Sequence, residues 1–527
     1  MATVTNSKLF VHNQTNGYVY APQYAGTVWP AGPWGGRSGL IQLTNDVVVS
    51  FNISAGGSNY SNPVITVGKP WAASTLEAQN TQVVSGANLY TVVFSGTSGT
   101  VAPTDVTGNN FTDGTATLKY AGKAAVITTT ANGGAIQSGY TILQSGGSGY
   151  LTTPTVYISD SGGGTGTGAI MTASLNQFPQ GSISPIVPGV VYLDSYTVIG
   201  QANGNLYASS INDPTIWTYG YIQVQNEPSG LVGIAKHLNY VVAFSQWSTQ
   251  FYYDTGQVYP NNVLAPSTSY SFEVGCVSGT SIVQMEQSVI WVGQAKTTGT
   301  GVYMLNGVSP FKISNSFIDR ILSNSNLSTT HAYIFKFNGH TFYVLTLHDL
   351  NLTIVYDIEE KEWYQWTMWA AGDADSGVSG IYAEQYFRPS YYASNYGPYQ
   401  VYYLLDDDNG VVYTLSDTQY SDAGAPIYFR SVTDIHDAQT MKRKFFRRIE
   451  VVGDKVPATM KIRRTDDDYR TWSSYRSVNL NVNRPVIYQC GQSRRAAWEF
   501  LCTDNQPIRL ESAEFDFDVG EIQEGQP

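Results

Sequence analysis

The sequence predicts an all-β protein built around a β-propeller-like repeat, and three observations support this fold class. Only 13% of the 527 residues are charged, and aromatic residues are equally frequent, with 38 tyrosines. This composition favours pleated, half-buried strands over helices. The 51 glycines supply the turns that many short strands require. Five segments between residues 181 and 431 each place two apolar strands around a short turn, which is typical of a repeated β unit.

Residues 1–45 form an opening sector with two strand-like runs, Lys8–Val11 and Leu40–Val49. We expect these strands to close the propeller formed by the later repeat. The first ten residues lack the charged and apolar stretches of a secretory signal. No apolar run reaches the roughly 18 residues that a membrane span needs. The sector therefore predicts neither a signal peptide nor a membrane anchor.

Residues 46–180 are nearly uncharged, rich in Gly, Ser and Thr, and contain one motif twice. The copies, Ser54–Val67 and Ser145–Ile158, each run from a Gly-rich turn through a Tyr and a Pro into an alternating strand. Between them, Asp113–Tyr120 is another turn followed by a strand. A flexible Gly/Ser linker is the alternative, but such linkers lack periodic strands. The sector is predicted to be an inserted β domain.

Residues 181–431 carry the repeat, at intervals of about 45 to 60 residues, near the period of propeller blades. Short strands expose their edges unless they pack radially against neighbours, as blades do. With the strands of residues 1–45, the segments predict six blades; a stack of β-sandwiches is the structural alternative. The predicted strand pairs are Tyr196–Ile199 with Asn205–Tyr207, Val241–Phe244 with Gln250–Tyr253, Val289–Val292 with Gly301–Leu305, Thr341–Leu345 with Thr353–Tyr356, and Val401–Leu405 with Gly410–Leu415.

Residues 432–527 differ from the rest of the chain in charge. Residues 1–429 hold 12 Lys and Arg against 25 Asp and Glu, residues 430–510 hold 16 against 9, and residues 511–527 hold none against 6. Alternating runs such as Met460–Arg464 predict strands. We expect a separate, sandwich-like β domain with a basic patch and an acidic tail. Such charge asymmetry usually marks separate surfaces for separate partners.

An ordered series of short strings between residues 190 and 370 resembles one protein family. The strings, in order, are Val191–Tyr196, Asn205–Trp217, Gly230–Ile234, Ala243–Thr249, Phe251–Gly256, Glu273–Cys276, Val289–Gly293, Gly301–Gly307, Ile313–Ser314, Thr341–Leu345 and Val355–Asp357 with Trp363. This series resembles the tail hub, or nozzle, proteins of short-tailed bacteriophages, the packaged-DNA stabilization family. The resemblance is close over residues 190–370 and loose over 371–510, and it does not extend to 46–180.

The resemblance implies a structural protein of the virion tail, assembled in the host cytoplasm. Its subunits would form a homo-oligomeric, hexameric ring attached to the portal and adaptor proteins of the head-to-tail connector. Such a ring continues the DNA channel, retains packaged double-stranded DNA without reading its sequence, and anchors tail fibres or tailspikes. The family offers no catalytic residues to carry over, and we expect no enzyme activity, no cofactor and no small-molecule substrate.

Two acidic turns in the sequence are candidate binding sites. Thr465–Trp472 is close to the Asp-box pattern, with Tyr469 where that pattern has Gly. An Asp box is a hairpin in which Asp bonds to backbone amides, so a structural role is expected. Asp406–Gly410 places Asp, Asp and Asn as a calcium loop does, but it lacks the later bidentate Glu. A hairpin turn is the alternative there.

Histidines and cysteines provide no metal site in the sequence. His340 and His348 flank a predicted strand and would lie about 26 Å apart at about 3.3 Å per residue, too far to share an ion. Cys276, Cys490 and Cys502 are too few and scattered for a disulfide framework or zinc site. We expect them to be small buried hydrophobes, in a chain that folds in a reducing compartment.

A glycan-binding or glycan-degrading tail protein is the alternative function. Glycosidases need two carboxylates about 5 Å or about 6.5–9.5 Å apart, and the many acidic residues leave such a pair open. Surface Tyr and Trp residues stack well on sugars. No nucleophile elbow and no phosphate-binding Gly loop is present in the sequence.

The basic run Lys442–Arg448 is the remaining candidate site, and we assign a partner interface to Lys442, Arg443, Lys444, Arg447 and Arg448. On a regular strand, Lys442, Lys444, Phe446 and Arg448 face one way and the intervening residues the other. Docking onto an acidic protein surface, contact with nucleic-acid phosphates, and a solvated face remain open as roles.

Overall fold

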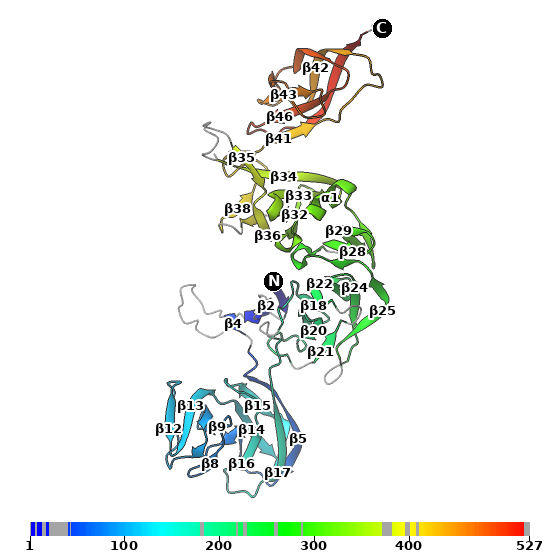
Figure 1. Ribbon diagram of the computed structural model, residues 1–527. Coiled ribbons are helices and arrows are strands. Elements are labelled where there is room, and N and C mark those ends of the chain that lie inside the picture. Colours follow the sequence, from blue (N-terminus) through cyan, green and yellow to red (C-terminus); the bar gives the residue numbers. More distant parts are fainter. Residues whose placement is uncertain are drawn as a thin grey trace. The chain divides into compact units, whose positions relative to one another are not determined.

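A computed structural model shows the architecture of the chain (Figure 1). It describes residues 2–5, 8–12, 17–20, 40–42, 44–179, 184–217, 220–224, 229–257, 262–285, 288–371, 382–395, 401–406 and 410–520. Two compact units are distinguished, Met1–Ser323 and Asn324–Pro527. The elements are overwhelmingly antiparallel strands, so the predicted all-β class is confirmed. Among the described residues, α1 (Ser316–Asn324) is the one α-helix, and no helix is long and apolar enough to cross a membrane.

The N-terminal strands form one antiparallel sheet in the order β1-β2-β3-β4. The predicted strand Lys8–Val11 lies within β2, whereas Leu40–Val49 is wrong as a single strand. The chain bends over residues 45–47, which separate β4 from β5. The strands are β1 (Ala2–Thr5), β2 (Lys8–His12), β3 (Gly17–Tyr20) and β4 (Leu40–Gln42).

The two copies of the Gly–Tyr–Pro motif lie side by side in the first unit. Their strands, β6 and β16, pair antiparallel, with Val67 opposite Val156. The long strands that lead into the copies, β5 and β15, include the start of each copy and pair with β17 and β14, respectively. The motif tyrosines, Tyr60 and Tyr150, are both buried in the core that these strands share. The repeat in the sequence is thus a repeat in the fold, which a flexible linker does not provide.

Between the motif copies, the sequence forms a five-stranded sheet in the order β12-β13-β10-β9-β7, which has its own core around Tyr90 and Leu118. The strands of residues 46–180 are β5 (Val48–Ser58), β6 (Pro63–Val67), β7 (Lys69–Pro70), β8 (Leu76–Glu77), β9 (Gln82–Ser85), β10 (Asn88–Phe94), β11 (Gly96–Thr97), β12 (Asn110–Asp113), β13 (Ala116–Lys123), β14 (Val126–Asn132), β15 (Ala135–Ser145), β16 (Val156–Asp160) and β17 (Thr167–Leu175).

Five successive antiparallel sheets follow, and each contains one of the five predicted strand pairs as hydrogen-bonded neighbours. In the first unit their strands are β18 (Val191–Leu193), β19 (Tyr196–Gly200), β20 (Asn205–Ala208), β21 (Tyr221–Gln223), β22 (Leu231–His237), β23 (Tyr240–Ser245), β24 (Thr249–Asp254), β25 (Leu264–Phe272), β26 (Gly275–Cys276), β27 (Val283–Gln284), β28 (Val289–Ala295), β29 (Gly299–Asn306) and β30 (Ser309–Lys312).

In the second unit they are β31 (His331–Phe337), β32 (His340–Leu347), β33 (Leu352–Asp357), β34 (Glu362–Ala371), β35 (Tyr382–Tyr386), β36 (Pro389–Asn395), β37 (Val401–Asp406) and β38 (Val412–Leu415), followed by the short pair β39 (Ser421–Asp422) and β40 (Ala425–Pro426).

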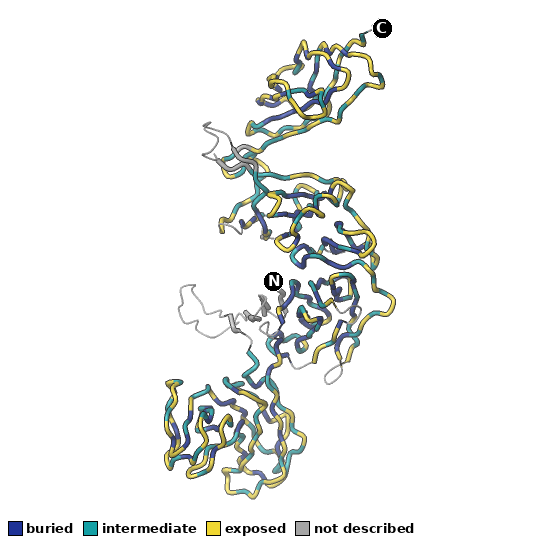
Figure 2. The backbone as a smooth tube through the Cα atoms, in the orientation of Figure 1, coloured by how far each residue is buried: buried dark blue, intermediate teal, exposed yellow. Residues whose placement is uncertain are grey.

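The inner strands of these sheets are covered on both faces. On β23, Val241 packs into the core shared with β19, while Phe244 packs into the core shared with β28. Phe244 and Trp291 of the next sheet have ring centroids 5.1 Å apart. The strands β19, β23 and β28 are buried along nearly their whole length, and buried stretches (dark blue) run through this part of the chain in Figure 2. Consecutive sheets stacked through both faces are the packing of propeller blades, whereas sandwich strands alternate between buried and exposed residues.

Most C-terminal strands show that alternation, although β46 is buried throughout. The strands form two facing sheets, β41-β46-β43-β44 and β45-β42-β47. Their inner faces enclose one core that includes Ile449, Met460 and Phe500. The predicted sandwich-like architecture is confirmed for these strands. They are β41 (Phe429–Val432), β42 (Lys444–Gly453), β43 (Thr459–Thr465), β44 (Arg476–Asn479), β45 (Val486–Ser493), β46 (Ala497–Cys502) and β47 (Leu510–Val519). The boundaries predicted for the four sectors of the chain stay predictions.

Candidate functional site

The basic run Lys442–Arg448 enters β42 at Lys444, which is a buried residue. Only 1% of Lys444 is exposed, and its ammonium donates hydrogen bonds to the backbone carbonyls of Thr440, Lys442 (3.2 Å) and Arg494 (2.6 Å). A buried ammonium is tolerated when such acceptors replace water. Lys444 therefore joins backbone segments inside the sandwich, and it does not belong to the outer surface of this domain.

The predicted alternation along the run is wrong from Arg447 onward, because β42 contains a bulge between Phe446 and Arg448. Phe446 and Ile449 both face the core, three residues apart instead of two or four. One extra residue in the strand is what a β-bulge provides. Arg448 consequently leaves the side of Phe446 and is half-exposed, next to the exposed Arg447.

Both arginines at the bulge already have acidic partners on β47. The guanidinium of Arg447 pairs with Asp518, and that of Arg448 lies 3.2 Å from Asp516. These pairs are largely exposed, so each contributes little to stability. They also neutralise part of the charge that the run presents to a partner.

Lys442 and Arg443 are the exposed residues of the run that form no ion pair with another described residue. Arg443 lines a hollow of about 350 Å³ at the end of the sandwich, where three loops meet. Arg494 and Arg495, which follow β45, line the same hollow, although about 50 residues separate them from Arg443. We missed these two arginines in the sequence; the adjacent pair Arg494–Arg495 was the available signal. The lining residues are Met441, Arg443, Asp466, Gln492, Ser493, Arg494 and Arg495.

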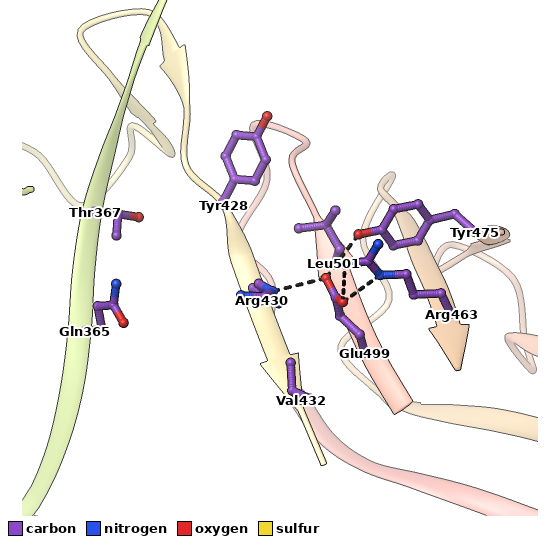
Figure 3. Close-up of a pocket in the computed structure, with 9 residues that line it drawn as sticks. All are labelled: Gln365, Thr367, Tyr428, Arg430, Val432, Arg463, Tyr475, Glu499 and Leu501. Atoms are coloured by element: carbon purple, nitrogen blue, oxygen red, sulfur yellow. Dashed lines mark hydrogen bonds and ion pairs between the residues drawn. The ribbon is translucent and has the colours of Figure 1, made fainter. Parts of the chain in front are cut away.

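A second charged cluster lies on the outer face of the sheet that contains β46 (Figure 3). The carboxylate of Glu499, 1% exposed, accepts hydrogen bonds from Arg430 (3.0 Å), Arg463 (2.6 Å) and the Tyr475 hydroxyl (3.0 Å). Burial opposes ionisation of Glu499, but these donors outweigh it and lower its pKa. The cluster lines a hollow of about 360 Å³ together with Gln365, Thr367, Tyr428, Val432 and Leu501.

Arg463 completes this cluster with two aromatic contacts. Its guanidinium carbon lies 4.7 Å from the ring centre of Trp472 and 4.5 Å from that of Tyr475. Two arginines and one glutamate leave the cluster with a net positive charge, but every charged group in it has a partner. We therefore assign it a structural role between β41, β43 and β46.

The predicted Asp box is confirmed as a structural turn. Asp467 accepts hydrogen bonds from the amides of Arg470 (3.1 Å) and Thr471 (2.9 Å). The Thr471 hydroxyl and amide lower the pKa of Asp467 to about 2. Tyr469, which replaces the usual Gly, has a left-handed φ of 65°, and its ring packs against Trp472 with 6.1 Å between centroids.

One group of three potential metal ligands occurs among the described residues, and the sequence reasoning missed it. Ligand atoms of His340, Asp357 and Glu360 lie within 4.8 Å of one another. However, Asp357 already accepts 2.6 Å and 3.0 Å hydrogen bonds from His340 Nδ1 and the amide of Glu359. His348 lies elsewhere and bonds to the carbonyl of Thr329. The Asp357 carboxylate thus stabilises the turn after β33.

The remaining candidates are the acidic turn Asp406–Gly410 and the three cysteines. The proposed calcium turn Asp406–Gly410 contains Asp407, Asp408 and Asn409, which lie outside the described residues. All three cysteines are free and buried, as predicted, and burial raises the pKa of each thiol.

Three solved structures with a distant likeness to the chain illustrate the comparison with known structures. BamB from Moraxella catarrhalis is 10% identical, with 62% of this chain and 89% of that chain covered and a TM-score of 0.23. The computationally designed Ika8 protein is 12% identical, with 82% and 100% covered and a TM-score of 0.27. The exo-beta-1,3-galactanase of Phanerochaete chrysosporium is 9% identical, with 86% and 99% covered and a TM-score of 0.22. These scores carry no argument about function, and no curated protein matches the chain.

The comparison with family models is decisive. The model described as "Bacteriophage P22 Gp10, beta-propeller" matches residues 84–420, more than half of the chain. The match includes all five blade-like sheets and ends before the C-terminal sandwich. It begins at Val84, inside the sector 46–180, to which we had not extended the family resemblance. The chain therefore belongs to the Phage_stabilise family, whose model describes the β-propeller of bacteriophage P22 Gp10, and it is a bacteriophage structural protein.

Proposed function

We propose that this protein is the tail hub, or nozzle, of a short-tailed bacteriophage. Its subunits form a closed hexameric ring below the portal and adaptor. The ring continues the DNA channel and anchors tail fibres or tailspikes. The single observation that carries this proposal is the family match over the blade-like sheets. Identical subunits close into a ring through heterologous, head-to-tail contacts.

The charge distribution supports a channel role. Residues 1–429 carry 12 basic against 25 acidic side chains, and duplex DNA carries one negative charge per about 1.7 Å. We propose that acidic side chains of this part line the bore, so that DNA passes without adhering. A map of the assembled ring with a bore lined by Lys and Arg would contradict this.

The exposed cations of the basic run support a docking role. Lys442, Arg443, Arg447 and Arg448 face solvent at least in part, whereas Lys444 does not. Charges at an interface rim accelerate association and orient the partners. We propose that these four residues contact a neighbouring subunit or the adaptor. On docking, the ion pairs that Arg447 and Arg448 form with Asp518 and Asp516 of β47 rearrange.

Two experiments test the proposal. Electron microscopy of the purified chain should show closed rings with a central channel; monomers at every concentration would contradict ring formation. A variant carrying Lys442→Glu, Arg443→Glu, Arg447→Glu and Arg448→Glu should fail to attach to DNA-filled heads. Lys455→Glu is the control, because Lys455 is exposed in the loop at the other end of β42. Normal attachment of the fourfold variant would reject the docking role.

We propose that the protein has no glycan-degrading activity. Incubation of the purified chain with capsular polysaccharide or lipopolysaccharide should leave glycan chain length unchanged. Shortened glycans would favour the alternative of a depolymerase.

A further inference from the structure

The hollow lined by Arg443, Arg494 and Arg495 contains positive charge that the domain does not neutralise. Arg495 is tied to Asp468 by a 2.6 Å ion pair, and Asp466 lies 3.9 Å from a different arginine, Arg464. Among the described residues, no carboxylate forms an ion pair with Arg443 or Arg494. Two guanidinium groups of the lining are therefore free to bind an anion.

The backbone around the hollow is fixed before any ligand binds. The Lys444 ammonium bonds to the carbonyls of both Lys442 and Arg494, which joins the two arginine-bearing loops. The carbonyl of Arg443 accepts a 2.8 Å hydrogen bond from the amide of Gly520, just after β47. The third loop is held by the hydrogen bonds of Asp467. A preorganised site loses little entropy on binding.

We propose that this hollow binds a single oxyanion group of the phosphate type. Guanidinium groups match the oxygens of phosphate with paired hydrogen bonds. Asp466, which is part of the lining, and Asp468, the partner of Arg495, disfavour a long polyanion such as duplex DNA, because its neighbouring phosphates would approach them. The ligand is therefore one phosphate group, either the free ion or a phosphate monoester.

Isothermal titration calorimetry of the full chain tests this site, with inorganic phosphate as the probe in a chloride buffer of constant ionic strength. We expect saturable binding of one phosphate per chain. Arg494→Gln should weaken the affinity about tenfold or more, because a charge-assisted hydrogen bond is lost. Arg509→Gln removes the same charge at the opposite end of the sandwich, next to β47, and should leave binding unchanged.

If Arg494→Gln does not fold, Arg443→Gln tests the same site and should also weaken the phosphate affinity. Unchanged phosphate affinity in either folded arginine variant overturns the proposal. A binding heat that chloride reproduces also overturns it, because phosphate would then be an adventitious ion only. Titration with phosphoserine separates the monoester from the free ion as the preferred ligand. If a duplex oligonucleotide bound more tightly than phosphate and Arg494→Gln abolished that binding, the phosphate proposal would be overturned in favour of a nucleic-acid site. These measurements need no ring, so their failure and a failure of the hub proposal are distinguishable.

Discussion

Arg443 and Lys444 are neighbours in the sequence, yet the fold uses their charges in opposite ways. The Lys444 ammonium is enclosed and bonded to three carbonyls, whereas the Arg443 guanidinium lines an open hollow. The sequence located the basic run, but it did not distinguish the structural cation from the exposed ones. That distinction depends on Arg494, which is 50 residues away from Lys444 and contributes a carbonyl.

Replacing Lys444 should therefore be far more harmful than replacing Arg447. Lys444→Met leaves three carbonyls without their donor and should lower the free energy of unfolding of the C-terminal domain by about 2–4 kcal/mol. Arg447→Met removes an exposed ion pair and should change it by at most about 0.5 kcal/mol. Hydrogen exchange of the β42 amides measures both. Equal protection in the two variants would contradict the role of Lys444.

Asp422 should make the protein less stable as the pH rises. Burial raises the pKa of Asp422 to about 6, so the folded state holds this proton more tightly than the unfolded state, whose carboxyl titrates near its usual value of 3.8. The resulting penalty is absent at low pH, grows between about pH 4 and pH 6, and is complete above that range.

Asp422→Asn should thus raise the free energy of unfolding by about 1–2 kcal/mol at pH 7.5, allowing for the partial exposure of the side chain. At about pH 2.5 the gain should vanish, because the wild-type carboxyl is then protonated in both states. Calorimetric melting at the two pH values measures the difference. A gain that persists at the lower pH would show that desolvation of the carboxylate is not its cause.

Individual strands were predictable because apolar alternation and turn residues are local signals. The five blade-like strand pairs, such as Tyr196–Ile199 with Asn205–Tyr207, were recovered in this way. The bulge after Phe446 was not, because its position depends on which residues the opposing strands β45 and β47 present. The pairing of β6 with β16, about 90 residues apart, was also beyond a local pattern. The sequence contained the repeated motif but not the contact between its copies.

Tyr150, the tyrosine of the second motif copy, joins two strands of the domain through its hydroxyl group. Its buried hydroxyl donates to the carbonyl of Val67 (3.1 Å) and accepts from the amide of Ala125 (2.7 Å), which links the end of β6 to the start of β14. Tyr150→Phe should lower the free energy of unfolding of this domain by about 2–4 kcal/mol, because two buried backbone groups lose their partner. Tyr157→Phe is the control, since Tyr157 is 41% exposed. Thermal melting that is identical for both variants would contradict the role of the hydroxyl.

At the scale of the whole molecule, the sector of residues 46–180 enters and leaves the rest of the chain at one place. The amide of Asn176 donates a 2.9 Å hydrogen bond to the carbonyl of Val47, and the side-chain amide of Asn45 bonds to the carbonyl of Phe178. The strands between these points share a core of their own. An element whose ends meet and whose core is internal is expected to be removable without loss of the fold around it.

We therefore predict that replacing residues 48–175 by a short Gly-Ser linker leaves the blade-like sheets folded. The linker closes only a small gap, so its entropic cost is small, and the buried inner strands such as β23 keep both of their neighbours. The excised segment should also fold alone. Circular dichroism and thermal melting of the two fragments, compared with the intact chain, provide the measurement. A deletion variant that melts without cooperativity would show that the sector 46–180 is part of the propeller fold instead of an insertion. The family match begins at Val84, inside this sector, so the deletion tests that alternative directly.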